Sequence, residues 1–152
     1  MGSLSLKKLY LDVCSLCRPF DEQSVARIRL ETAALYLVFE YIRKMRYEMI
    51  VSPVHYMEIA AISYLQERVE VMEFINTFGT FPSWNLKAVK KRADELYQMK
   101  LGPADAAHVA FAEAEADVFV TCDDRLLRKC MKHLIRVPAM NPVEFSIKEE
   151  LQ

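Results

Sequence analysis

Glycine, cysteine and long apolar runs are all scarce in this sequence. The 152 residues include three Gly, six Pro and four Cys, which excludes a collagen-like or low-complexity chain and gives too few cysteines for a disulfide scaffold. The most apolar stretch, residues 49–65, is interrupted by Pro53, His55 and Glu58, whereas a membrane-spanning helix needs about 20 consecutive apolar residues. We therefore expect a soluble, folded protein with free thiols and no membrane association.

Neither sign of charge dominates the chain. Twenty Lys and Arg residues stand against 21 Asp and Glu residues, for a net charge of -1. Because non-specific binding to nucleic acid scales with the number of phosphates neutralised, any nucleic-acid contact is expected to be local. The sequence does not open with a basic segment followed by an apolar core, so no secretory signal is predicted and a cytoplasmic location is expected.

Short apolar runs typical of buried strands alternate with amphipathic helical patterns. Strands are predicted at residues 8–13, 49–51 and 117–121, with a further short strand near Ile135. Helices are predicted at residues 24–45, from Pro53 onward, and at 68–78, 86–99, 103–116 and 123–133, with a polar loop around residues 18–21. This alternation predicts a single α/β domain over residues 1–152, a three-layer α/β/α sandwich with a short, mostly parallel central sheet.

Acidic side chains recur where predicted strands end and the following helices begin. Asp12 closes the first predicted strand, Asp123 and Asp124 follow the strand at 117–121, and Asp105 is the third residue of the helix that begins at Pro103. Ligands in parallel α/β sheets collect outside the carboxyl ends of the strands. Each acid alone has an ordinary explanation as a helix cap or a solvated side chain. Their equivalent positions together favour one carboxylate cluster.

Glu58 interrupts a predicted apolar helix face formed by Val54, Met57, Ala61 and Leu65. A buried, unpaired carboxylate costs several kcal/mol, so either a cation or a structural partner such as an arginine is expected beside it. Clustered carboxylates also repel one another. A divalent ion with a preference for oxygen ligands, Mg²⁺ or Mn²⁺, resolves both costs.

Four segments carry a resemblance to the PIN-domain family of metal-dependent nucleases, which includes the toxin ribonucleases of toxin–antitoxin pairs. The segments are LYLDV at 9–13, SPVHYMEI at 52–59, GPADAAH at 102–108 and VFVTCDDRLL at 118–127. Residues 12–15 and 17–24 also resemble the toxin branch. The resemblance implies a PIN-like fold, metal ligation by Asp12, Glu58, Asp105 and Asp123, and outer contacts from Thr121 and Asp124. It further implies that one or two Mg²⁺ ions assist hydrolysis of RNA, that the chain forms a homodimer, and that an antitoxin protein can be its partner.

One position departs from the family pattern. Many members have Thr or Ser directly after the first aspartate, where this chain has Val13, and Ser15 is the candidate to supply the missing hydroxyl. The rival interpretation is therefore a PIN-like module that binds RNA or protein with little or no cleavage. Apolar surface on the helix at 24–45, including Tyr36, Val38 and Tyr41, is compatible with a homodimer.

Basic residues near the predicted cluster are candidates for binding the RNA backbone. Arg125, Arg128, Lys129 and Lys132 recur at helical spacing on one face of the helix at 123–133. Arg18 is a further candidate in the predicted loop. A basic face is often simply solvated, and the same ambiguity applies to Lys87, Lys90, Lys91 and Arg92.

Other chemistries fit the sequence less well. Cys14 and Cys17 have the spacing of a redox pair, but the next helix is expected only near Ser24, which would leave the thiolate without stabilisation by a helix N-terminus. His55, His108 and His133 show no zinc-ligand pattern and are predicted to be ordinary helix residues. A phosphatase with a nucleophilic aspartate needs a second acid two residues after Asp12, where Cys14 stands.

Overall fold

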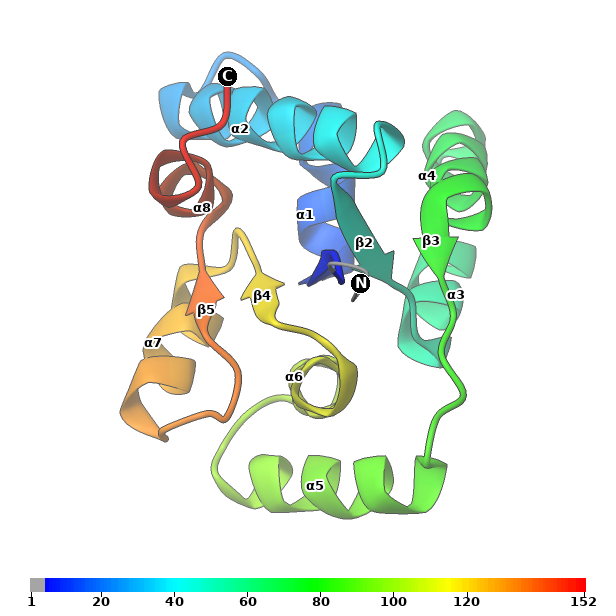
Figure 1. Ribbon diagram of the computed structural model, residues 1–152, viewed down its shortest axis with the longest axis vertical. Helices are drawn as coiled ribbons and strands as arrows, with labels where there is room; N and C mark the ends of the chain where they lie inside the picture. The colour runs from blue at the N-terminus through cyan, green and yellow to red at the C-terminus, as the bar shows by residue number, and fades with distance from the viewer. Residues whose placement is uncertain (1–4) are drawn as a thin grey trace.

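Short parallel strands form the centre of the structure, a computed structural model that describes residues 5–152 (Figure 1). Residues 1–4 of the predicted domain lie outside this range. Within it, five strands are present: β1 (Lys7–Leu11), β2 (Tyr47–Ile50), β3 (Gly79–Thr80), β4 (Val118–Val120) and β5 (Ala139–Met140). Their order is β3-β2-β1-β4-β5, and every neighbouring pair is parallel. The predicted parallel sheet is confirmed.

Helices cover both faces of this sheet. Among residues 5–152 they are α1 (Val13–Cys17), the 3-10 helix η1 (Arg18–Phe20), α2 (Ala26–Arg43), α3 (Pro53–Ala60), α4 (Leu65–Phe78), α5 (Leu86–Gln98), α6 (Pro103–Glu115), α7 (Asp124–Lys132) and α8 (Pro142–Lys148). No helix of this described part is long and apolar enough to cross a membrane.

Alternation along the strands divides the core into two layers. Leu9 and Leu11 of β1 pack with α1, α2, α4 and α8, whereas Tyr10 between them packs with α5, α6 and α7. Figure 1 shows α2 and α8 on one side of the strands and α5 and α6 on the other. Because successive side chains of a strand point to opposite faces, this division produces the predicted three-layer α/β/α sandwich.

Several elements differ from the sequence prediction. The expected loop after the first strand is helical, because α1 and η1 follow β1 directly, and the last strand is β5 rather than a strand near Ile135. β3 and α8 were not predicted. Gly79 allows β3 to lie close to β2, since a Cβ at this position would meet Val51 Cγ2 at 2.4 Å and the carbonyl oxygen of Ile75 at 2.5 Å.

A buried carboxylate on α2 joins elements from three parts of the chain. Glu31 Oε1 lies 3.1 Å from Arg18 Nε of η1, and Glu31 Oε2 lies 3.3 Å from Arg27 Nε. Asn141, the N-cap of α8, donates a hydrogen bond from Nδ2 to Glu31 Oε2 at 2.5 Å. Arg27 also donates from Nη2 to Asp124 Oδ1 at 2.6 Å. The two guanidinium groups thus compensate the buried charge of Glu31.

Glu31→Gln is expected to lower the free energy of unfolding by about 3 kcal/mol, because breaking a buried ion pair leaves its partners uncompensated. Denaturant unfolding monitored by circular dichroism measures this change. Glu40→Gln on the same helix is the matched control, because Glu40 forms an exposed pair with Lys44 at 3.0 Å and such pairs contribute about 0.5 kcal/mol. Equal effects of the two substitutions would contradict the description of Glu31 as a buried carboxylate that depends on its ion pairs.

Candidate functional site

The predicted acids approach one another at the carboxyl edge of the sheet. Asp12 follows β1 and Asp123 follows β4, and these strands are neighbours in register, with Leu11 opposite Val120. Asp105 lies in the first turn of α6. Its pKa is raised, first by burial and then by the negative charges of Asp123, Asp12 and Glu58, with His108 opposing them. The four carboxylates are therefore close enough to influence one another electrostatically.

Proximity does not make these acids a ready-made metal site. Within the described part of the chain, no group of three or more His, Cys, Asp or Glu side chains is placed so that it could hold a metal ion. The side chains of Asp12, Glu58 and Asp123 are instead engaged in hydrogen bonds to protein groups. The structure thus brings the four predicted ligands to one region, but their side chains are not arranged to bind one metal ion together.

Asp12 is buried and tightly held. Its Oδ2 accepts a hydrogen bond from Thr121 Oγ1 at 2.5 Å, and its Oδ1 accepts from the backbone N–H of Ser15 and from Cys14 Sγ, each at 3.1 Å. Asp12 thereby caps α1. Ser15 contributes its backbone N–H, while its hydroxyl donates to the carbonyl oxygen of Val120 at 3.4 Å. Thr121 and Cys14 therefore donate side-chain hydrogen bonds to Asp12, which the apolar side chain of Val13 cannot do.

Asp123 and Asp124 have different environments although they are adjacent. Asp123 Oδ1 caps α7 by accepting from the N–H groups of Arg125 at 2.9 Å and Leu126 at 3.1 Å. The backbone N–H of Asp123 donates to Thr121 Oγ1 at 3.0 Å, which links it to Asp12 through one hydroxyl. Asp124 pairs with Arg27, and this bond lowers the pKa of Asp124. The structure places Asp124 against α2 and not against Asp12.

Glu58 is paired with a histidine. Its Oε1 forms a hydrogen bond with Nε2 of His108, which lowers the pKa of Glu58 despite the opposing effect of burial. The predicted apolar face around Glu58 is wrong, because Met57 is 73% exposed, Leu65 is 65% exposed and Leu65 belongs to α4. The Glu58 side chain is itself 37% exposed. Glu58 therefore has a structural partner, but this partner is the imidazole of His108 on α6 and not an arginine.

Behind this pair lies a buried polar network. The Tyr10 hydroxyl is 2.6 Å from His108 Nδ1 and 2.7 Å from Ser52 Oγ. His55 Nδ1 accepts from the N–H of Ser52 at 3.0 Å, and its Nε2 lies 2.6 Å from the carbonyl oxygen of Leu11, to which it must donate. Burial and the neighbouring His108 lower the pKa of His55 to about 3.

The prediction that His55 and His108 are ordinary helix residues is therefore wrong. Both are buried, and both belong to the network beside Glu58 and Asp12. A signal was present in the sequence, because His55 stands three positions before Glu58 and His108 three positions after Asp105, and this spacing places side chains on one helix face.

The four cysteines are free thiols in the structure. The prediction that the next helix begins only near Ser24 is wrong, since α1 starts at Val13. Burial and the charge of Asp12 nevertheless raise the pKa of Cys14, and burial raises the pKa of Cys17 to about 12. Both thiols therefore stay protonated near neutral pH, which disfavours thiolate chemistry.

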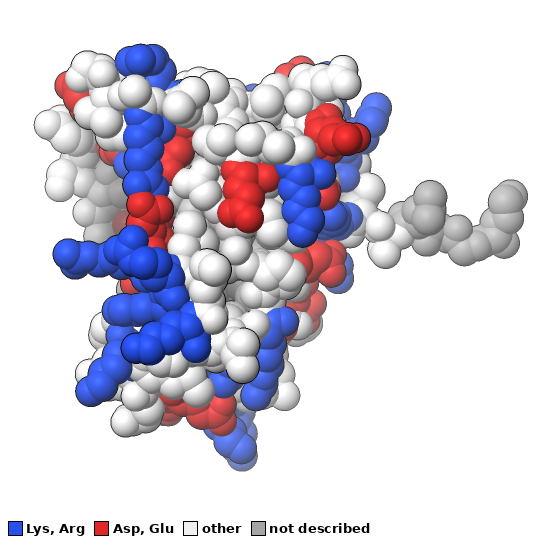
Figure 2. Space-filling model, turned by 90° about the vertical axis from the view of Figure 1, so that its left-hand side faces the viewer, with Lys and Arg blue, Asp and Glu red and all other residues white. Residues whose placement is uncertain are grey.

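The predicted RNA-binding residues fall into two groups. Arg125 and Arg128 are exposed on α7, and Figure 2 shows Lys and Arg side chains concentrated on the side of the molecule where α7 lies. Lys129 instead donates from Nζ to the carbonyl oxygen of Lys100 at 2.9 Å. Arg18 pairs with Asp21 at 3.0 Å and with Glu31. Exposed cations beside Asp123 thus come from Arg125 and Arg128.

Basic residues of α5 form a separate surface. Lys87, Lys90 and Lys91 are exposed there. Arg92 instead lies against α6, where its Nε donates to Glu113 Oε1 at 2.6 Å. Arg92 is therefore engaged in a structural ion pair.

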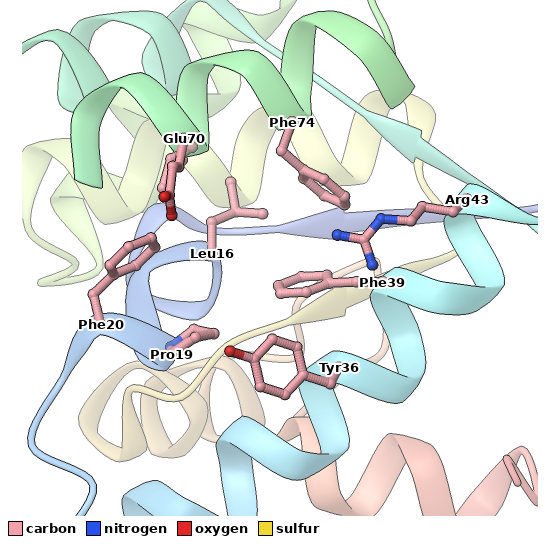
Figure 3. Close-up of a pocket in the computed structure, with 9 residues that line it drawn as sticks. Leu16, Pro19, Phe20, Tyr36, Phe39, Arg43, Glu70 and Phe74 are labelled. Carbon is pink, nitrogen blue, oxygen red and sulfur yellow. The ribbon is translucent and has the colours of Figure 1, made fainter. Parts of the chain in front are cut away.

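The surface proposed for dimerisation is smaller than the sequence suggested. Val38 is 0% exposed and belongs to the core, whereas Tyr36 is exposed. Tyr36 lines an apolar pocket of about 160 Å³ with residues of α1, η1, α2 and α4. Figure 3 shows Glu70 and Arg43 on opposite sides of this pocket, with Phe39 and Phe74 between them. The pocket includes none of the four predicted ligands.

Comparison with known proteins gives no match to a family model and none to a curated protein. The resemblance to PIN-domain nucleases therefore rests on the order and spacing of the four acidic segments.

The buried His55 is expected to make the fold less stable in mild acid. The unfolded chain binds a proton at the ordinary histidine pKa of 6.5, whereas the folded chain does so only near about 3, so stability falls as the pH drops below about 6.5. The free energy of unfolding should decrease by roughly 1 kcal/mol between about pH 7.5 and about pH 5.5 from this group.

Denaturant titrations at several pH values measure this slope. His55→Gln should flatten the slope, whereas His133→Gln, at the end of α7 and outside the network, should leave it unchanged. An unchanged slope in a folded His55→Gln protein would contradict the assignment.

Proposed function

We propose that this chain is a metal-dependent endoribonuclease that hydrolyses RNA phosphodiester bonds. The observation that carries the proposal is the approach of Asp12 and Asp123 at the ends of neighbouring parallel strands, where Thr121 bonds to both residues. Burial and the charges of Asp123, Asp12 and Glu58 also raise the pKa of Asp105. Because the ionised form of Asp105 is destabilised in this region, a divalent cation bound there would stabilise it. The resemblance of the four acidic segments to PIN-domain nucleases supports the same chemistry.

The donor chemistry fits a hard divalent ion. Asp12, Glu58, Asp105 and Asp123 offer carboxylate oxygens, the ligands that Mg²⁺ and Mn²⁺ prefer, and they would hold one or two such ions. When bound, the metal supplies Lewis acidity to the scissile phosphate and lowers the pKa of a coordinated water. Since the described side chains are not grouped as ligands, we expect ion binding to require rearrangement of these carboxylates.

Other residues have supporting roles in this proposal. Thr121 holds both Asp12 and the backbone of Asp123, which fixes the two strand ends relative to each other. Arg125 and Arg128 extend from the helix that Asp123 caps, so they lie where they can contact RNA phosphates on one side of the acids. Lys129 is held by a backbone carbonyl and contributes mainly positive potential.

The resemblance to the toxin branch leads to a finer proposal. The chain acts as the toxin of a toxin–antitoxin pair in the cytoplasm, forms a homodimer and is controlled by an antitoxin protein. A second candidate is a PIN-like module that binds RNA without cutting it. The ungrouped acids and Val13 favour this alternative, and a cleavage assay separates the two.

Purified protein is expected to cut single-stranded RNA in Mn²⁺ and to lose this activity in a chelator. Asp12→Asn should reduce cleavage at least about 100-fold, because it removes one charge of a buried ligand. Asp94→Asn, on the exposed face of α5, is the matched control and should retain activity. RNA binding without cleavage would support the non-cutting module, and cleavage that persists in chelator would contradict the proposal.

Asp105→Asn should separate stability from activity. Because burial and neighbouring charges destabilise the ionised carboxylate of Asp105, the neutral amide is expected to raise the unfolding temperature of the metal-free protein by a few degrees. The same substitution should abolish most RNA cleavage, since a metal ligand is lost. Thermal unfolding in chelator at neutral pH measures the first effect. A lower unfolding temperature would show that Asp105 has a structural role.

A further inference from the structure

Glu58 is held from behind by buried residues of two other elements. Its carboxylate is 37% exposed, whereas the side chain of its partner His108 is 3% exposed. His108 Nδ1 lies 2.6 Å from the hydroxyl of Tyr10, which is fully buried on the central strand β1. The network therefore runs from the sheet interior to a partly exposed carboxylate at the candidate site.

Hydrogen-bond chemistry fixes the direction of each contact. An ionised Glu58 carboxylate only accepts hydrogen bonds, so His108 Nε2 must donate to it. In the neutral ring, Nδ1 then accepts from the Tyr10 hydroxyl. Ser52 Oγ, 2.7 Å from the same phenol oxygen, can donate to that oxygen in turn. Each polar atom of this series has a partner of the complementary kind.

The surrounding structure leaves these groups little freedom. Tyr10 contacts the rings of His55, His108 and Phe119 at centroid distances of 4.6, 5.5 and 5.8 Å. His55 uses both ring nitrogens on backbone groups, the N–H of Ser52 and the carbonyl of Leu11. Leu11 directly precedes Asp12. The network thus joins the helix that carries Glu58 to the strand end that carries Asp12.

The network ends at a carboxylate that is partly exposed and can therefore meet a ligand. We propose that Tyr10 and His108 are positioning residues that orient Glu58 toward the other acids and so strengthen binding of a divalent cation. This inference rests on the proposed function. Groups that hydrogen-bond to metal ligands fix ligand orientation, and their loss typically weakens metal binding about 10-fold to 100-fold.

The test measures binding of Mn²⁺ alone to the full chain by isothermal titration calorimetry. Tyr10→Phe keeps the ring but removes the hydroxyl, and we expect it to weaken Mn²⁺ binding about tenfold. Tyr47→Phe is the matched control, because the Tyr47 hydroxyl donates to Glu149 at 3.1 Å, away from the acids, and it should bind like the wild type. In RNA cleavage, Tyr10→Phe should lower kcat and leave KM unchanged.

Two His108 variants keep the test decisive if Tyr10→Phe does not fold. His108→Gln retains an N–H donor for Glu58 and should bind Mn²⁺ more tightly than His108→Leu, which has none. NMR of labelled histidine in the metal-free protein adds a readout independent of activity. It should show a proton on Nε2 and an acceptor Nδ1 in His108, and Tyr10→Phe should shift His108 but not His133.

The outcomes separate this inference from the proposed function. If the wild type binds Mn²⁺ and folded Tyr10→Phe and His108→Leu bind it equally well, the positioning role is overturned while the nuclease proposal stands. If the wild type neither binds Mn²⁺ nor cuts RNA, both proposals fall. Graded loss, with His108→Gln above His108→Leu, supports the positioning role.

Discussion

Repulsion between carboxylates at the carboxyl edge of a parallel sheet is the constraint on which the candidate site depends. Parallel pairing puts the ends of β1 and β4 side by side. Asp12 directly follows β1, and Asp123 comes three residues after the end of β4. The hydroxyl of Thr121 lies between them, donating to one and accepting from the backbone of the other. The fold itself therefore keeps negative groups close together and prevents them from separating.

Two carboxylates in this protein, one buried and one half-buried, have opposite electrostatic surroundings. Glu31 lies among two guanidinium groups and an amide, which oppose its negative charge. Asp105 lies among other acids, and its pKa is raised. Removing the charge of Glu31 would leave its buried partners uncompensated, whereas the ionised form of Asp105 lowers the stability of the fold. Destabilised groups of the second kind are characteristic of functional sites.

The sequence predicted the layers and the positions of the acids because both follow from local patterns. Apolar runs at residues 8–13 and 117–121 identify the central strands, and Asp12 and Asp123 stand at or just after the ends of these runs. β3 and β5 have two residues each, which is too short for a periodic signal. The side-chain partners of the acids could not be predicted either, because they come from distant segments of the chain. His108 is 50 positions from Glu58 in the sequence, and Arg27 is 97 positions from Asp124.

Both edges of the sheet are formed by its shortest strands, β3 and β5. A strand of two residues presents very few free N–H and C=O groups along its outer side. Another extended chain therefore finds almost no template there for adding itself to the sheet. The brevity that hides these strands from sequence patterns thus also protects the molecule against edge-to-edge aggregation.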